Sequence, residues 1–243
     1  MQRELLDAYH NNDIPPLRLL NRLFRGGRIL FGYYQGGLTV EYLAEHHGFK
    51  PVVSMLKAYG DDQGTERIFQ KTYGYSTREF DKRFRKWIFE KKLSGLKLLP
   101  RLDDKGLARV RGRVQDRPAD LEPRVRLGFG HLSRQQVVEA GIQAGAVLRI
   151  NPDHALANLL YADILRLRKK PEQAMETYAK GFRLGADSFD ARMHFGELLE
   201  QADQPDQALR QYQAAKACWP QCTDQASSPM LRIAKVLRQQ GKL

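Results

Sequence analysis

The sequence predicts an all-α chain, in which a helical N-terminal subdomain precedes an α-solenoid of three helical hairpins and a capping helix. Two observations lead to this prediction. Small residues recur every 34 positions after residue 121. The first 92 residues lack this repeat but carry clear start and stop signals of helices. No run approaches the roughly 20 apolar residues that a membrane span needs.

Helix signals follow one another through the N-terminal region. The segment from Pro51 to Gly60 places apolar residues on one face, and a short helix is expected from Thr65 to about Gly74. Ser76 and Glu79 form a capping box at the start of a third helix. The large apolar side chains of that helix share one face: Phe80, Phe84, Trp87 and Ile88. Residues 1–95 are therefore expected to pack as one helical region.

The repeat is carried by small side chains. With Leu121, Ala155 and Phe189 as first positions, the eighth and twentieth positions of each unit hold only glycine or alanine. These residues are Gly128, Ala162 and Gly196, then Ala140, Ala174 and Ala208. Small residues there let two antiparallel helices approach closely. The predicted units are 121–154, 155–188 and 189–222, followed by a capping segment, 223–243, with an amphipathic helix from about Pro229.

This pattern resembles the tetratricopeptide repeat (TPR) family, closely in the second and third units and less closely in the first. The resemblance implies a concave groove, lined by the first helix of each unit, that holds a protein or peptide. In this register the second unit presents Leu156, Leu159, Asp163 and Arg166, and the third presents Asp190, Met193, Glu197 and Glu200. The groove would thus run from apolar to acidic, which favours an extended or helical partner segment with basic and apolar character.

A basic linker is predicted over residues 96–120. The stretch from Arg78 to Arg117 holds fourteen Lys/Arg against six Asp/Glu, which is +8 of the net charge of +12. Such a stripe can attract phosphate backbones or anionic surfaces. No nucleic-acid-binding motif accompanies it, and a solvated helix face followed by a hinge is the preferred interpretation. The part from Lys105 to Val114 is expected to form a short helix or an edge strand.

One string in the N-terminal region has a second family resemblance. Residues 31–43, FGYYQGGLTVEYL, together with Gly48-Phe49 and the helix after Ser76, resemble the C-terminal helical part of gluzincin zinc metallopeptidase domains. In that family a zinc ion polarises water for attack on a peptide bond, and a downstream tyrosine stabilises the oxyanion. The resemblance implies this role for Tyr33, as a vestige; the alternative is a core aromatic residue.

The zinc-binding motif of that family is absent from this sequence. No histidine is followed by Glu-x-x-His, and the adjacent His46 and His47 project about 100° apart on a helix. They are expected to lie at the end of a helix that stops at Gly48. Cys218 and Cys222 lack the further ligands of a structural zinc site. We therefore predict no metal and no cofactor in this chain, with zinc expected only in a full-length parent enzyme.

The sequence is thus interpreted as a protein–protein interaction scaffold that is not catalytic as it stands. The active site of a parent metallopeptidase is expected upstream of Met1. Two alternatives remain open: a self-standing TPR adaptor that was never linked to an enzyme, and a basic adaptor for RNA or an anionic surface. The charged start of the chain lacks the apolar region of a secretory signal, so a cytoplasmic location is the default expectation.

Overall fold

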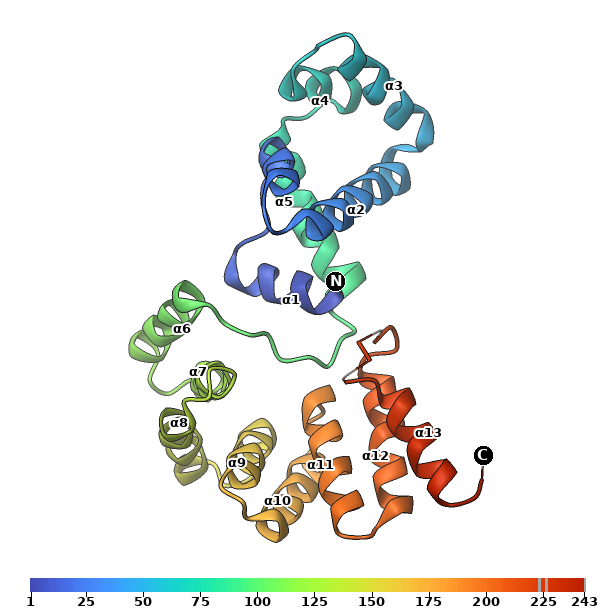
Figure 1. Cartoon of the computed structure of the whole chain (residues 1–243). Coiled ribbons are helices and arrows are strands. Elements are labelled where there is room, and N and C mark those ends of the chain that lie inside the picture. The colour runs from blue at the N-terminus through green and yellow to red at the C-terminus, as the bar shows by residue number, and fades with distance from the viewer. Residues whose placement is uncertain (223, 226, 243) are drawn as a thin grey trace. The chain divides into compact units, whose positions relative to one another are not determined.

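The computed structural model describes residues 1–222, 224–225 and 227–242. The chain divides into two compact units, Met1–Gly95 and Leu96–Leu243. Every regular element in the described residues is a helix, so the predicted all-α fold class is confirmed (Figure 1). None of these helices combines the length and the apolar character that crossing a bilayer requires.

The first unit contains seven helical segments. They are α1 (Gln2–Asn11), the 3₁₀ helix η1 (Leu17–Arg25), α2 (Ile29–His47), α3 (Phe49–Gly60), α4 (Thr65–Tyr73), α5 (Thr77–Ile88) and the π-helical turn η2 (Phe89–Leu93). An aromatic cluster lies at the contact of α2 and α5, where Tyr42 packs edge-on against Phe80, Phe84 and Trp87. Offset and edge-on aromatic pairs of this kind add to the burial energy of the core.

Several ends of these helices lie where the sequence predicts them, although α3 begins at Phe49, two residues before Pro51. The Ser76 hydroxyl accepts the Glu79 backbone N–H at the start of α5, as the capping box predicts. Gly74 ends α4 with a φ of 77°, and Gly48 follows α2 with a φ of 81°. Positive φ at these two positions favours glycine, because a side chain would strain the backbone.

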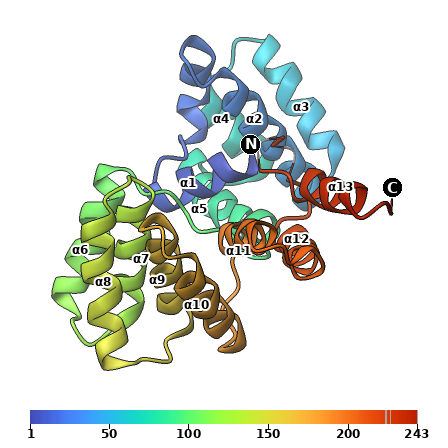
Figure 2. The ribbon, with the colours of Figure 1, turned by 60° about the horizontal axis from the view of Figure 1, so that its bottom comes forward.

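The second unit is a solenoid of antiparallel hairpins. Its helices are α6 (Asp104–Asp116), α7 (Leu121–Leu132), α8 (Val137–Ile150), α9 (Ala155–Leu167), α10 (Pro171–Arg183), α11 (Phe189–Gln201), α12 (Pro205–Cys218) and α13 (Pro229–Gln239). The hairpins are α7–α8, α9–α10 and α11–α12, and Figures 1 and 2 show each one stacked on the next. Their first helices begin at Leu121, Ala155 and Phe189, the first positions of the 34-residue register. The predicted α-solenoid of three helical hairpins followed by a further helix, α13, is confirmed.

Close helix contact explains the small residues of the repeat. A Cβ atom added to Gly196 on α11 would lie 2.5 Å from the Tyr212 ring on α12. One added to Gly128 on α7 would lie 2.4 Å from Leu160 on α9. The glycines thus act both within a hairpin and between successive hairpins. Any larger residue would force the helices apart, which typically costs about 1–3 kcal/mol.

Candidate protein-interaction site

The predicted groove residues were assigned to the first helices of the second and third hairpins. Leu159 on α9 is fully buried, and its side chain lies 2.6 Å from the place that a Cβ atom on Gly181 would take. It therefore fills the space between α9 and α10. Met193 on α11 is also buried, with 6% of its surface exposed. Neither side chain is open to a partner in this structure.

Asp163 lies at the centre of a buried polar network that joins two hairpins. Its carboxylate accepts the Tyr178 hydroxyl and lies 2.7 Å from Nδ1 of His194 on α11. Arg166 contributes a weaker contact, with Nε 3.7 Å from the same oxygen. Two predicted groove residues, Asp163 and Arg166, thus connect α9 to its neighbours within the protein.

The charges of this network shift the pKa values of its members. Burial alone would raise the pKa of Asp163, but the charge and hydrogen bond of His194 outweigh burial, and the pKa of Asp163 is lowered. Burial alone would lower the pKa of His194, but the Asp163 carboxylate raises it above its usual value. The pair therefore favours its charged form.

The acidic end of the predicted groove contacts the capping helix. Glu197 accepts a hydrogen bond of 2.6 Å from Arg232 of α13, and Glu200 one of 2.9 Å from Lys235 of the same helix. The Tyr212 hydroxyl also donates to Glu200. Helix α13 thus takes the place that the first helix of a further unit would take beside α11. Asp190 on α11 is half-buried and also has a partner within the chain.

The first part of the predicted linker is bound to the repeats. Residues 96–102 form no helix or strand and run as a drawn-out segment before α6 (Figure 1), and the Lys97 N–H donates to the carbonyl oxygen of Cys218, at a distance of 3.1 Å. The Lys97 carbonyl oxygen accepts the N–H of Phe189, the first residue of α11, at 2.8 Å. Further along, Leu102 is buried in a cluster with Leu107, Val114 and Leu127. The segment therefore runs from the start of α11 to the first hairpin, and it is not a free hinge.

A cavity of about 480 Å³ lies beside Lys97, at the starts of the first helices. Its lining includes Leu156, a predicted groove residue that is half-buried. Carboxylates surround it: Glu122 lies 3.6 Å from His154, Asp153 pairs with Lys180, and Asp187 pairs with Arg192. This open part of the groove is thus lined by three carboxylates and one lysine beside an apolar patch, and two of the carboxylates are paired with cations.

The basic stripe is divided between the two units. On α5 and η2, Arg83 pairs with Glu79, Lys91 with Glu45 and Lys92 with Glu41. The N-terminal part of the stripe therefore has much of its charge neutralised locally.

Tyr33 lies on the surface of α2, with 66% of its area exposed. Its ring contacts Phe24 edge-on, at 5.0 Å between the ring centroids, so it is not a core residue. Gln35 points inward instead and donates from Nε2 to the Pro15 carbonyl at 2.7 Å. No group of three His, Cys, Asp or Glu side chains in the described residues is arranged to hold a metal ion.

His46 and His47 lie in the last turn of α2, as expected. His46 Nδ1 is 2.9 Å from the Tyr42 carbonyl, whereas His47 Nε2 is 2.9 Å from the Tyr75 hydroxyl. Burial and the neighbouring charges of His46 and Arg83 lower the pKa of His47. The lowered pKa favours the neutral form of His47.

Comparisons with known proteins assign no partner. No family model matches the sequence, and no curated protein matches it. Among solved structures, a thermophilic TPR protein from Thermus thermophilus is similar, with 17% sequence identity and a TM-score of 0.44. The similarity covers 78% of this chain and 98% of that protein.

Proposed function

We propose that residues 96–243 form a protein-interaction scaffold that binds an extended segment rich in basic and apolar side chains. One observation carries the proposal: the chain's own segment Leu96–Leu102, with the sequence LKLLPRL, forms no helix or strand and is held on the repeats by main-chain hydrogen bonds of Lys97. Recognition of extended peptides commonly combines main-chain hydrogen bonds with pockets for alternate side chains.

Charge supports the same type of partner. Among the charged residues that line the cavity, Glu122, Asp153 and Asp187 outnumber Lys97, which belongs to the internal segment itself, and Leu156 adds an apolar contact. Electrostatic complementarity steers partners and selects among them, so an acidic lining favours basic segments over acidic ones. The internal segment would then compete with an external partner for the same side of the solenoid.

A peptide with the sequence LKLLPRL tests this proposal in trans. Lys97→Pro removes the N–H that donates to Cys218, which weakens the internal competitor, whereas Lys97→Ala keeps that N–H. We expect the labelled peptide to bind the Lys97→Pro chain more tightly than the wild type or Lys97→Ala, as measured by fluorescence anisotropy. A peptide with glutamate in place of its lysine and arginine is the control. Equal affinity for all three chains, or equal binding of both peptides, would contradict the proposal.

We also propose that the first unit is the C-terminal helical part of a gluzincin-type domain, without catalytic activity of its own. The exposed position of Tyr33 on α2 supports this, because an oxyanion-stabilising hydroxyl must reach a substrate. The genomic sequence in frame upstream of Met1 is the test. An H-E-x-x-H helix there is expected, and a frame that lacks one would leave the scaffold as a self-standing adaptor.

A further inference from the structure

Helix α8 carries an apolar ridge that faces solvent. Val138, Ile142, Ala146 and Ile150 follow one another at intervals of four residues, so they form one row along the helix surface. The exposed fraction is 66% for Val138, 61% for Ile142 and 66% for Ile150, and Ala146 is half-buried. The buried residues of α8 all lie on the opposite side of the helix. These four residues are called the α8 ridge below.

The second helices of the other two hairpins carry charge where α8 is apolar. In α10 and α12, the positions that match Val138 and Ile142 in the 34-residue register hold exposed charged residues. They are Glu172 and Glu176, then Asp206 and Arg210. Single apolar residues are normal on a protein surface, whereas a contiguous apolar row marks a surface that contacts another molecule. The α8 ridge thus differs from the solvated faces of the equivalent helices.

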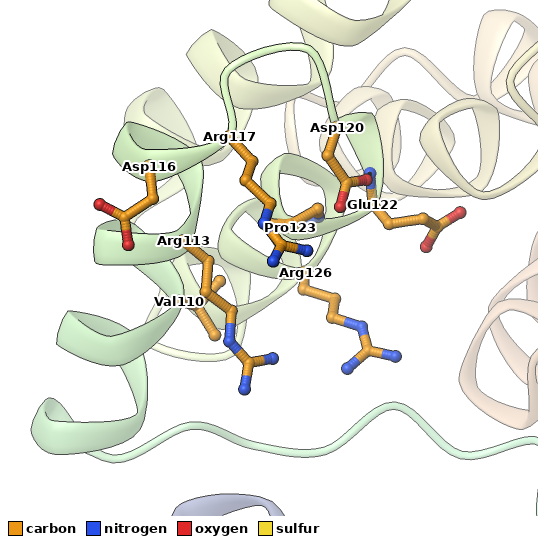
Figure 3. A pocket seen from close by; sticks show the side chains of 8 residues that line it. All are labelled: Val110, Arg113, Asp116, Arg117, Asp120, Glu122, Pro123 and Arg126. Carbon is orange, nitrogen blue, oxygen red and sulfur yellow. Dashed lines mark hydrogen bonds between the residues drawn. The ribbon is translucent and has the colours of Figure 1, made fainter.

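The surface around α8 is polar and offers no competing apolar site. Between residues 104 and 150, the large apolar side chains that are exposed all belong to the α8 ridge. The pocket between α6 and α7 holds three arginines and three carboxylates, so its charges balance (Figure 3). Its charged residues are Arg113, Arg117, Arg126, Asp116, Asp120 and Glu122. A balanced lining favours neither an anionic nor a cationic ligand.

Helix α8 has two charged residues, one near each end. Glu139 lies in the first turn and Arg149 in the last turn, and both are exposed. Their signs suit the helix dipole. Neither side chain forms an ion pair or a hydrogen bond with another residue in the described part of the chain. Both charges can therefore pair with groups outside the chain.

The exposed side of α8 is complementary to itself about the level of Ala144. Glu139 and Arg149 stand five residues before and five residues after Ala144, and their charges are opposite. Two α8 helices that pack antiparallel about a two-fold axis at this level would bring each Glu139 to the height of Arg149 of the second copy. Most dimers of identical chains have such an axis, which requires a surface to match itself. Two ion pairs would then form together.

The apolar ridge obeys the same symmetry. In the antiparallel pair, Val138 would lie at the height of Ile150 of the second copy, and Ile142 at the height of Ala146. A large residue beside a small one at the centre lets the helix axes approach to about 8–10 Å. Parallel packing would instead place like charges together, because Glu139 would face Glu139 and Arg149 would face Arg149. The charges of α8 thus select the antiparallel arrangement.

We propose that the chain forms a homodimer in which the α8 ridges of two copies pack antiparallel. This inference goes beyond the scaffold function proposed above and does not depend on it. One pair of helices buries less than the roughly 800 Å² per partner that is typical of stable complexes. The dimer should therefore dissociate in the micromolar range of concentration.

Sedimentation equilibrium of the full-length chain from about 1 to 300 μM tests the proposal. The test variant is Ile142→Glu, which the fold should accept because Glu176 and Arg210 occupy the matching positions. The control is Leu56→Glu on α3, where the replaced side chain is 59% exposed and the change in charge is the same. We expect the control to dimerise like the wild type and the test variant to lose affinity about tenfold or more. Both should give the wild-type helical signal in circular dichroism.

Exchange of the two charges tests the antiparallel arrangement. Glu139→Arg or Arg149→Glu alone places like charges at the same height, so each should weaken the dimer about fivefold. The double variant, which carries both changes, should regain affinity. A mixture of the two single variants should form a heterodimer that is tighter than either homodimer. A site for a different protein would not show this rescue.

Several results would overturn the proposal. A wild type that stays monomeric up to the highest concentration would exclude a second copy as the occupant and leave the ridge to a helix of another protein. Equal dissociation constants for the wild type and Ile142→Glu would exclude the α8 ridge as the interface. A double variant as weak as the single ones would contradict antiparallel packing. Binding of the LKLLPRL peptide to the Lys97→Pro chain should not change with Ile142→Glu, so the two proposals can fail separately.

Discussion

His194 on α11 and Asp163 on α9 form an ion pair between successive hairpins, with 2.7 Å between Nδ1 and Oδ1. The Tyr178 hydroxyl also donates to Asp163, and Arg166 lies near the same carboxylate. The charge of Asp190 raises the pKa of His194 as well. Because the two carboxylates favour the charged imidazole and Arg166 opposes it, the stability of this junction depends on pH.

The first prediction concerns this pH dependence. The raised pKa of His194 gives stability that is complete below the ordinary value of 6.5 and is lost as the pH rises through the folded-state value. The lowered pKa of Asp163 gives stability that is complete above 3.8 and is lost as the pH falls through its folded-state value. The pair thus stabilises the fold most between these two pH values.

His194→Ala should lower the free energy of unfolding by about 2 kcal/mol at pH 5, because it leaves a buried carboxylate without its charged partner. At pH 8 the difference from the wild type should be smaller. Urea denaturation followed by circular dichroism at both pH values measures it. A difference that stays the same, or grows, from pH 5 to pH 8 would show that the ion pair does not stabilise the junction.

The second prediction compares two helix glycines. Gly196→Ala should destabilise the chain by about 2 kcal/mol, since the new Cβ atom would meet the Tyr212 ring at 2.5 Å. Gly145→Ala on α8 is the matched control, because nothing lies within 4 Å of the Cβ position there. This control should stabilise the chain by about 0.5–1 kcal/mol through helix propensity alone. Thermal melting of both variants measures the two changes in stability. Equal changes would argue against close packing of α11 on α12.

The third prediction concerns the N-terminal limit of the solenoid. Leu102 and Leu107 cover Gly130 of α7, where an added Cβ atom would lie 3.1 and 2.7 Å from their side chains. A fragment of residues 96–243 should therefore be more stable than one of residues 121–243. Removal of residues 96–120 should lower the free energy of unfolding by about 1.5 kcal/mol or more for each buried side chain that is lost, including Val114. Equal unfolding midpoints of the two fragments would mean that α6 does not belong to the folded solenoid.

The fourth prediction concerns the two thiols. Burial, together with the charge and hydrogen bonding of Asp187, raises the pKa of Cys218 to about 12. Because the thiolate is the reactive form, Cys218 should resist alkylation in the native protein. Cys222 is half-buried and should react first with iodoacetamide at pH 8, as followed by peptide mass spectrometry. Preferential labelling of Cys218 would show that burial and Asp187 do not suppress its thiolate form.

Much of the solenoid could be predicted because its signal is local and repeated. Glycine and alanine at the eighth and twentieth positions are required wherever two helices touch, so the same residue types recur in step. Gly106 and Pro118 stand at the same register positions one unit earlier, before the first of the three predicted units. The first half of that unit has no matching residues, and the arginine-rich composition of α6 favoured a linker.

The candidate sites were less predictable. Asp163 and Glu197 stand at groove positions in the register. Their carboxylate oxygens nevertheless form hydrogen bonds with His194 and Arg232 of neighbouring helices. No local pattern predicts such a pairing, because it depends on which side chains successive helices bring together. The hydrogen bonds of Lys97 with Phe189 and Cys218 could not be predicted either, because main-chain hydrogen bonds do not depend on which side chains stand at those positions.

The sequence by itself determined the helices, their ends and the 34-residue step, because capping residues, glycines and apolar periodicity act over a few neighbouring positions. Only the tertiary structure decided which charged groups remain unpaired. Among the described residues, Asp163 and Glu197 are bound by side chains of the next helices, whereas the guanidinium groups of Arg113, Arg117 and Arg126 have no ion pair or hydrogen bond. That distinction depends on contacts between residues about 30 positions apart, at distances that only the folded chain sets.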